Sequence, residues 1–356
     1  MNDTPDTAVR RRPSRYPSAV AGRPAAGSGD AVEIAEGVFW LRMPVPNDLE
    51  AVNVWLLADG DGWTIVDTGM KLSETAVGWR AAMAGVMKGR PITRVVVTHL
   101  HPDHSGMAGW LCDKSGAPLH MSSLEYLTLR VMASDQGEPP PEAIAFYRAC
   151  GWDEAALDEY RASFGRFGKA VYALPPVFRA LRDHDVLTIG DRQWQVVIGS
   201  GHSPEHVSLY CEEEGLLISG DQILPDISSN VSVHPQQPDS DPLTDWLETL
   251  AMLRDRVPAD VVVLPSHGDP FRGLHQRIGE LIDGHEQGLR KLLDALDMPK
   301  RATDLFAVLF RREITSGLLF LATGESLAHL ACLRTRGQID TWLDAEGIRW
   351  WRRADG

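Results

Sequence analysis

The chain has 356 residues, 44% of them hydrophobic, so it is long enough for two domains and can bury a sizeable core. Acidic side chains outnumber basic ones by 49 to 35, and the formal net charge of -14 disfavours nucleic acid as a partner. No uninterrupted run of about 18 apolar residues occurs, which argues against a membrane span.

Residues 1–30 are rich in Arg, Pro, Ala and Gly and lack hydrophobic periodicity, so we predict a flexible leader. The arginines at positions 10–12 are not followed by an apolar segment, and a secretory signal is therefore not expected. The four cysteines are widely spaced without a CxxC pair, which suggests neither a disulfide framework nor a zinc knuckle. These features favour a cytoplasmic location.

Short apolar segments with Gly and Asp at the turns begin at Gly37 and predict an antiparallel meander over residues 37–44, 51–60 and 62–69. Residues 73–87 then predict a helix, and residues 94–100 predict a buried strand. Strands resume after position 185, and a helix at 242–257 precedes another strand. The simplest architecture with this order is α/β, with two mixed sheets face to face and helices outside.

Residues from about 123 to 181 interrupt this alternation with a mostly helical, aromatic-rich insertion that contains no predicted metal ligand. Helical insertions beside a catalytic mouth commonly act as lids, whereas an aromatic stripe can equally form ordinary core. Both interpretations stay open. Residues 274–356 predict three helices and a hairpin, which suggests a small winged-helix domain.

Metal-binding side chains gather just after the valine-rich strand, where His99, His101, Asp103 and His104 lie within six residues. At the end of a strand, such groups can turn toward one point beyond the sheet edge. Three later apolar strands are each followed by His202, Asp221 or His267. Because strand ends along one sheet edge can converge, we predict a single metal centre.

The segment THLHPDH at 98–104 matches the HxHxDH signature of the metallo-β-lactamase superfamily, and the three later residues resemble its remaining ligands in order and spacing. IVDTG at 65–69 is similar to the Asp-bearing strand end that precedes this signature. The resemblance implies a four-layer αββα metallo-β-lactamase sandwich over residues 31–273. Asp221, where true β-lactamases usually have cysteine, indicates the glyoxalase II-like or lactonase-like branch.

By this resemblance, His99, His101 and His202 bind one divalent metal, Asp103, His104 and His267 bind a second, and Asp221 bridges them. Imidazoles suit zinc, which we expect, while the carboxylates would also accept iron or manganese. Asp67 and His206 are expected to hold ligand imidazoles in the correct tautomer, although His206 could equally be an ordinary polar residue at a strand start.

Two metals can share a hydroxide at neutral pH, so we expect a binuclear hydrolase. The hydroxide attacks the carbonyl of a small acyl thioester, such as an acyl-CoA, or of an ester or lactone. Asp103 is expected to orient it and accept its proton. Residues 220–235 line the mouth, where Ser228, Ser229, Asn230 and His234 either contact the substrate or satisfy the loop's own backbone. No Lys and Arg cluster follows Asp221, which disfavours a standard glyoxalase II.

Three other functions remain open. The tail resembles the winged-helix module of some metallo-β-lactamase hydrolases, including an endoribonuclease-like branch, so RNA cleavage involving Arg334 and Arg336 is one alternative. The tail's nearly balanced charge instead favours packing or homodimerisation. His99, His202 and Asp221 also resemble the facial triad of mononuclear iron persulfide dioxygenases. A non-enzymatic binding protein is least expected, because structural zinc sites are closed.

Overall fold

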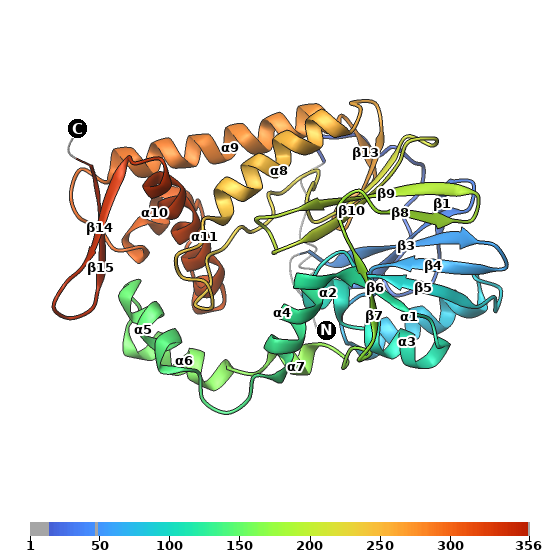
Figure 1. Cartoon of the computed structure of the whole chain (residues 1–356), viewed down its shortest axis with the longest axis horizontal. Coiled ribbons are helices and arrows are strands. Elements are labelled where there is room, and N and C mark those ends of the chain that lie inside the picture. The colour runs from blue at the N-terminus through green and yellow to red at the C-terminus, as the bar shows by residue number, and fades with distance from the viewer. Residues whose placement is uncertain (1–13, 47–48, 355–356) are drawn as a thin grey trace, which may run out of the picture.

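Two mixed β-sheets lie face to face at one end of the molecule, in a computed structural model that describes residues 14–46 and 49–354 (Figure 1). Helices cover the outer faces of both sheets, and an arm of C-terminal helices extends away from them. The predicted α/β sandwich, with two sheets packed between helices, is therefore confirmed.

The first sheet has seven strands in chain order. They are β1 (Val32–Ala35), β2 (Val38–Pro44), β3 (Ala51–Asp59), β4 (Gly62–Val66), β5 (Ile92–Val96), β6 (Leu119–Ser122) and β7 (Phe178–Leu181). The pairs from β1 to β4 are antiparallel, which confirms the predicted meander, and those from β4 to β7 are parallel.

The second sheet has the order β13-β12-β11-β10-β9-β8. Its strands are β8 (Val186–Ile189), β9 (Arg192–Gly199), β10 (His206–Cys211), β11 (Leu216–Gly220), β12 (Val262–Pro265) and β13 (Phe271–Arg272). Only the β11–β12 pair is parallel. Since β10 runs antiparallel to both β9 and β11, the strands β9, β11 and β12 all end at the same sheet edge.

Three apolar clusters hold these layers together. Between the sheets, Trp40 and Trp55 pack in one cluster with Trp194 and Leu209. The outer face of the first sheet buries α1 (Ser73–Ala84) and α3 (Ala108–Ser115), which follow the short α2 (Pro102–Ser105). The outer face of the second sheet buries α8 (Pro242–Arg256). Burial on both faces explains why the strands read as continuous apolar runs.

The insertion contains four helices before it returns to the first sheet as β7. They are α4 (Ser123–Ser134), α5 (Pro141–Ala149), α6 (Glu154–Ser163) and α7 (Phe167–Ala170). Tyr147 and Trp152 are buried in the same cluster as residues of the C-terminal module. These two aromatic residues are therefore core, and they attach the insertion to the C-terminal helices.

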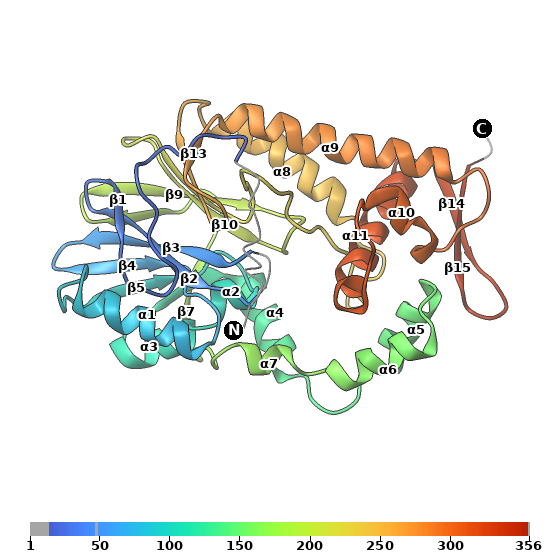
Figure 2. The ribbon, with the colours of Figure 1, turned by 180° about the vertical axis from the view of Figure 1, so that it is seen from behind.

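The C-terminal module begins with the long α9 (Leu274–Ala295), followed by η1 (Thr303–Leu305), α10 (Phe306–Leu309), α11 (Ser316–Thr335) and the hairpin β14 (Ile339–Leu343) and β15 (Arg349–Arg353) (Figure 2). The predicted helices and hairpin are present. Residues of α8, α9 and α11 share one core, so the module is not packed separately from the second sheet. The helix α11 is long and apolar enough to span a membrane, but 61% of its most apolar window is buried in the fold.

The predicted flexible leader is wrong for residues 14–30. Tyr16 is 5% exposed and its ring packs on Phe271, while the backbone N–H of Ala19 donates to the carbonyl of Pro270. A composition rich in Pro and Gly has no helical or strand period, so this docking onto the second sheet left no pattern to detect. Residues 1–13 lie outside the described part of the chain.

Candidate metal centre

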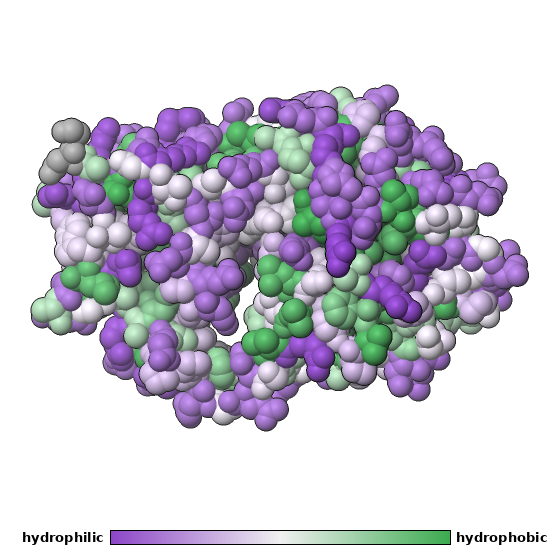
Figure 3. All heavy atoms as spheres, in the orientation of Figure 1, coloured by the Kyte–Doolittle hydropathy of each residue, from purple (hydrophilic) through white to green (hydrophobic). Residues whose placement is uncertain are grey.

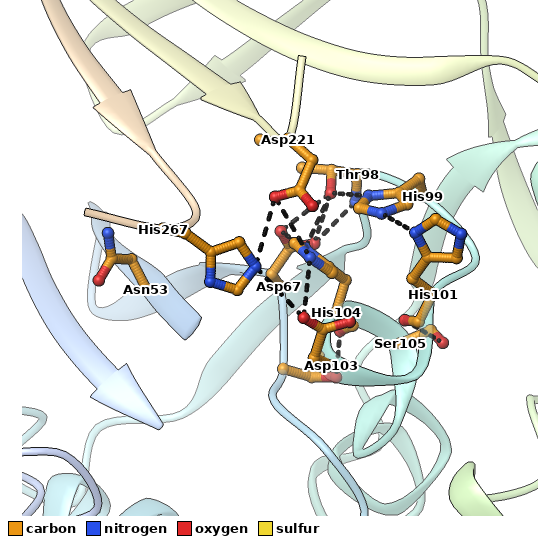
Figure 4. Close-up of polar contacts among 12 residues, drawn as sticks. Asn53, Asp67, Thr98, His99, His101, Asp103, His104, Ser105, Asp221 and His267 are labelled. Carbon is orange, nitrogen blue, oxygen red and sulfur yellow. Dashed lines mark hydrogen bonds and ion pairs between the residues drawn. The ribbon is translucent and has the colours of Figure 1, made fainter. Parts of the chain in front are cut away.

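The signature residues lie in the turn that follows β5. His99 and His101 precede α2, and Asp103 and His104 lie in its first turn. Pro102 occupies the first helical position, where its missing N–H costs no hydrogen bond. This turn brings all four side chains beyond the edge of the first sheet, where Asp221 and His267 approach from the second sheet (Figure 4).

Three imidazoles form one half of the cluster. Nε2 of His99 lies 2.9 Å from Nδ1 of His101 and 3.2 Å from Nε2 of His202. The ring of His202 comes from the turn after β9 in the second sheet. These three nitrogen atoms are close enough to bind a single cation together.

The other half of the cluster joins Asp103, His104 and His267. Oδ2 of Asp103 lies 3.3 Å from Nε2 of His267 and 3.6 Å from Nε2 of His104. Oδ1 of Asp221 lies 3.5 Å from the His104 nitrogen, while its Oδ2 lies 3.4 Å from Nε2 of His202. Asp221 therefore contacts both halves, and all seven predicted ligands are brought together.

The donor atoms suit a divalent cation. Nε2 of His104, Nε2 of His267 and Oδ1 of Asp221 are buried, and no hydrogen-bonding partner satisfies them. Such orphaned polar atoms are costly unless something binds them. Burial also lowers the pKa of His101 to about 3, so that ring is neutral and offers a lone pair at neutral pH.

The imidazole of His104 is surrounded by carboxylates, which raise its pKa strongly. Burial would lower the pKa of His104, but the carboxylates of Asp103, Asp221 and Asp67 hold it well above its usual range. Burial would likewise raise the pKa of Asp221, yet the imidazoles of His104 and His267 hold it well below its usual range. Without a cation, a proton on His104 therefore neutralises part of this negative charge.

Asp67 lies behind the cluster, as predicted for a group that orients a ligand. Its Oδ2 is 2.8 Å from Nδ1 of His104, and its Oδ1 accepts hydrogen bonds from the backbone N–H and hydroxyl of Thr98. The Thr98 hydroxyl also lies 3.0 Å from Nδ1 of His99. Thr98 therefore helps to orient two ligands, a role that sequence reasoning did not assign.

His206 is buried at the site but does not contact a ligand imidazole through a hydrogen bond. Its Nε2 accepts the backbone N–H of Asp221 at 3.1 Å. Of the two roles left open for His206, this contact fits the ordinary polar residue: its hydrogen bond goes to the backbone that carries Asp221. Gly220 adopts a φ of +54°, and a Cβ added there would collide with the His206 ring.

Backbone carbonyls orient two further ligands. Nδ1 of His202 lies 2.7 Å from the carbonyl of Asn230, and Nδ1 of His267 lies 3.0 Å from the carbonyl of Ala51. Nδ2 of Asn53 donates to the carbonyls of Pro265 and Gly268 and so clamps the turn that carries His267 (Figure 4). In both rings the carbonyl fixes Nδ1 as the protonated nitrogen, which leaves Nε2 free to bind a cation.

Glu125 is a buried carboxylate that sequence reasoning missed. Its two oxygens accept the backbone N–H groups of Leu100 and Glu205, each at 2.8 Å. Leu100 lies between two predicted ligands, and Glu205 follows His202 closely. Glu125 therefore ties the two ligand turns together. The only signal in the sequence was an acidic residue in an otherwise apolar helix face.

Most polar side chains of the loop after Asp221 form hydrogen bonds with neighbouring protein groups. The Ser229 hydroxyl donates to the carbonyl of Asp221, and the Ser228 hydroxyl lies 3.1 Å from Nε2 of His285. Nδ2 of Asn230 donates to Oε2 of Glu325 on α11. The side chain of His234 is exposed, and its ring stacks on Phe320 with centroids 5.6 Å apart.

Comparison with known proteins gives two family matches. Residues 47–267 match the metallo-beta-lactamase superfamily, and residues 289–354 match the metallo-beta-lactamase-like C-terminal domain. The second match covers most of the helices and hairpin of the C-terminal module.

Individual proteins are similar over most of the chain. A beta-lactamase domain protein from Burkholderia ambifaria superimposes with a TM-score of 0.88 at 39% identity, over 95% of this chain and 98% of that one. Probable metallo-hydrolase YqjP of Bacillus subtilis is 25% identical over 88% of this chain and 97% of its own length. The human acyl-coenzyme A thioesterase MBLAC2 is 26% identical over 67% of this chain and 80% of its own.

Proposed function

The chain belongs to the metallo-beta-lactamase superfamily of metallo-hydrolases, and we propose that it cleaves small acyl thioesters of the acyl-CoA type at a binuclear metal centre. Esters and lactones are the runner-up substrates, because they present the same carbonyl to the same groups. The observation that carries the proposal is the cluster of seven buried or half-buried side chains, three of which point unsatisfied donor or acceptor atoms at one another.

In this proposal His99, His101 and His202 hold one cation, Asp103, His104 and His267 hold the other, and Asp221 binds both. The donor set of five imidazoles and two carboxylates suits zinc first, with iron or manganese as alternatives. When bound, such cations supply Lewis acidity, which lowers the pKa of water and polarises a carbonyl oxygen.

The protein's own contribution is orientation and proton handling. Asp103 is the more exposed of the two carboxylates, with 18% of its side chain accessible against 10% for Asp221. It is therefore the carboxylate that an entering substrate and an attacking water can reach. Asp103 accepts the proton of that water at a carboxylate oxygen, while the carbonyls of Asn230 and Ala51 and the carboxylate of Asp67 keep the ligand rings fixed.

The names of two relatives support a thioester over other acyl compounds. The human relative MBLAC2 is named an acyl-coenzyme A thioesterase, and another relative, from Emericella nidulans, is named atrochrysone carboxyl ACP thioesterase.

A second candidate is a mononuclear iron dioxygenase acting on a persulfide. Nε2 of His202 lies within 3.4 Å of both the His99 ring nitrogen and an Asp221 oxygen, so these three groups alone could bind one metal on one side. The RNA-cleaving alternative has less support, because Arg336 is paired with Glu286 at 2.7 Å and Arg334 donates to the carbonyl of Asp239.

The test is metal content by mass spectrometry on the purified protein, paired with turnover of a thioester, ester and lactone panel before and after chelation. Two zinc ions per chain with chelator-sensitive thioester cleavage is the expected result. One iron per chain with no hydrolysis, but with oxygen consumption on a persulfide, would replace the hydrolase with the dioxygenase.

A further inference from the structure

Exposed apolar side chains concentrate on elements that border the candidate metal centre. Twelve large hydrophobic residues are exposed in the described part of the chain, and half of them lie on α4, on the loop after Asp221 or on the first turns of α11. Figure 3 shows hydrophobic side chains gathered over α4, beside a gap in this face of the molecule. The six residues are Leu124, Leu127, Val131, Ile227, Phe320 and Leu321.

The α4 residues form a stripe. Leu124, Leu127 and Val131 are 42%, 55% and 61% exposed and lie at the spacing of one helix face. The opposite face is the one that packs on the first sheet, through Tyr126 and Leu129. A helix that only covers a core would present polar groups to water, so an apolar outer face is typical of a binding surface.

The stripe begins beside the turns that carry the predicted ligands. The backbone N–H of Leu124 donates to Oε2 of Glu205 at 2.9 Å, and the neighbouring Glu125 binds the backbone of Leu100 and Glu205. The first turn of α4 is therefore hydrogen-bonded to both turns that carry ligands. From there the stripe runs outward for about 10 Å, at 1.5 Å per helical residue.

A second apolar wall comes from α11 and is linked to the same centre. The carbonyl of Leu321 accepts a hydrogen bond from Asn230, whose own carbonyl orients His202. The Phe320 ring packs between His234 and Tyr147, with centroids 5.6 and 5.8 Å away. Leu321 is 45% exposed and Phe320 is 38% exposed, so both present apolar surface beside the loop that carries Asn230.

We propose that this apolar rim, formed by Leu124, Leu127, Val131, Phe320 and Leu321, binds the acyl chain of the substrate. This inference rests on the proposed function and narrows it to thioesters of medium-length or longer aliphatic acids. A chain of about eight carbons would run the length of the stripe from a carbonyl held at the metal centre. A second copy of the protein seated on the rim would instead cover the mouth of the centre.

The experiment compares the metal-loaded wild type with Leu127→Ser and with Val77→Ser. Val77 lies on α1, on the outer layer, and is 56% exposed against 55% for Leu127, so it is a matched control. For acyl-CoA substrates of four to ten carbons, kcat/KM should rise about two- to fourfold per methylene in the wild type and in Val77→Ser. Leu127→Ser should lower the ten-carbon to four-carbon ratio at least fivefold.

Decanoate binding by calorimetry provides a readout that does not need turnover. Leu127→Ser should weaken decanoate at least fivefold relative to Val77→Ser, with acetate unchanged. If no thioester is cleaved but this difference is found, the proposed function fails while the apolar rim stands. If thioesters are cleaved without chain-length preference and decanoate binds all three proteins alike, the rim is overturned. A wild-type dimer that Leu127→Ser dissociates, without any change in decanoate affinity, would assign the rim to self-association and also overturn the inference.

Discussion

Oδ2 of Asp67 lies 2.8 Å from Nδ1 of His104, and neither side chain is more than 1% exposed. Asp67 reaches this position with a left-handed backbone, φ +61°, which is uncommon for a residue other than glycine. Three polar groups on His104 and Thr98 depend on this one carboxylate. The left-handed backbone and the buried carboxylate of Asp67 therefore both serve to orient His104, a predicted metal ligand.

Asp67→Asn should lower metal affinity about tenfold to a hundredfold, because it removes the charge that holds the His104 ring in its binding orientation. Competition with a chelator, read by metal content, measures this loss. Asp59→Asn is the control, since Asp59 is a hydrogen-bonded carboxylate at the opposite end of the sheet. Equal affinity for both variants and the wild type would show that Asp67 does not orient a ligand.

Removing one ligand from each half of the cluster should remove one metal at a time. We expect His101→Ala and His267→Ala each to reduce the content from about two to about one ion per chain, and Asp221→Ala to weaken both sites. His275→Ala, whose ring contacts the carbonyl of Val257 away from the cluster, should retain the full content. A content of two metal ions per chain in His101→Ala would contradict the assignment of His101 as a metal ligand.

Gly220→Ala should disturb the metal centre, because the added methyl group would meet the His206 ring that holds the Asp221 backbone. Gly215→Ala is a close control, with a φ of +60° and open space around the new methyl. Both substitutions should cost about 1 kcal/mol from backbone strain alone. Only Gly220→Ala should also lower metal occupancy, and equal occupancy would argue against this role for His206.

Trp152→Ala should destabilise the protein by about 3–5 kcal/mol, because it empties a buried site between the insertion and α11. Trp152 is 8% exposed, and its Nε1 donates to the Thr323 hydroxyl at 2.9 Å. Trp152→Phe should cost less, since it keeps most of the packing. Urea unfolding measures both, with Trp342→Ala, at a 40% exposed position on β14, expected to stay within about 0.5 kcal/mol.

Glu325 should make stability depend on pH. Burial raises its pKa to about 7, above the ordinary value of 4.5, despite a hydrogen bond from Asn230. The folded state therefore holds a proton that the unfolded state releases, so this residue reduces stability as pH rises from about 4.5 to 7, by at most about 3 kcal/mol. Melting temperatures should show Glu325→Gln gaining on the wild type across that range, whereas the exposed Glu313→Gln should not.

The local pattern of apolar and polar residues in the sequence determined the fold class and the convergence of the predicted ligands. The alternation of apolar strands and helices predicted the α/β sandwich, because strands buried on both faces must be apolar throughout. Placing His99, Asp221 and His267 just after such strands predicted their convergence, since the strands that carry them end at one edge of the two-sheet stack. Local hydrophobic periodicity likewise predicted the helices and hairpin of the C-terminal module.

Only the tertiary structure decided what surrounds those residues. Residues 14–30 dock on the second sheet, Glu125 joins two ligand turns, and His206 holds the backbone of Asp221 rather than an imidazole. Each of these contacts joins segments far apart in the chain or depends on the path of a turn. Sequence periodicity reports which face of an element is buried, but it carries no information about which distant group will satisfy a buried polar atom.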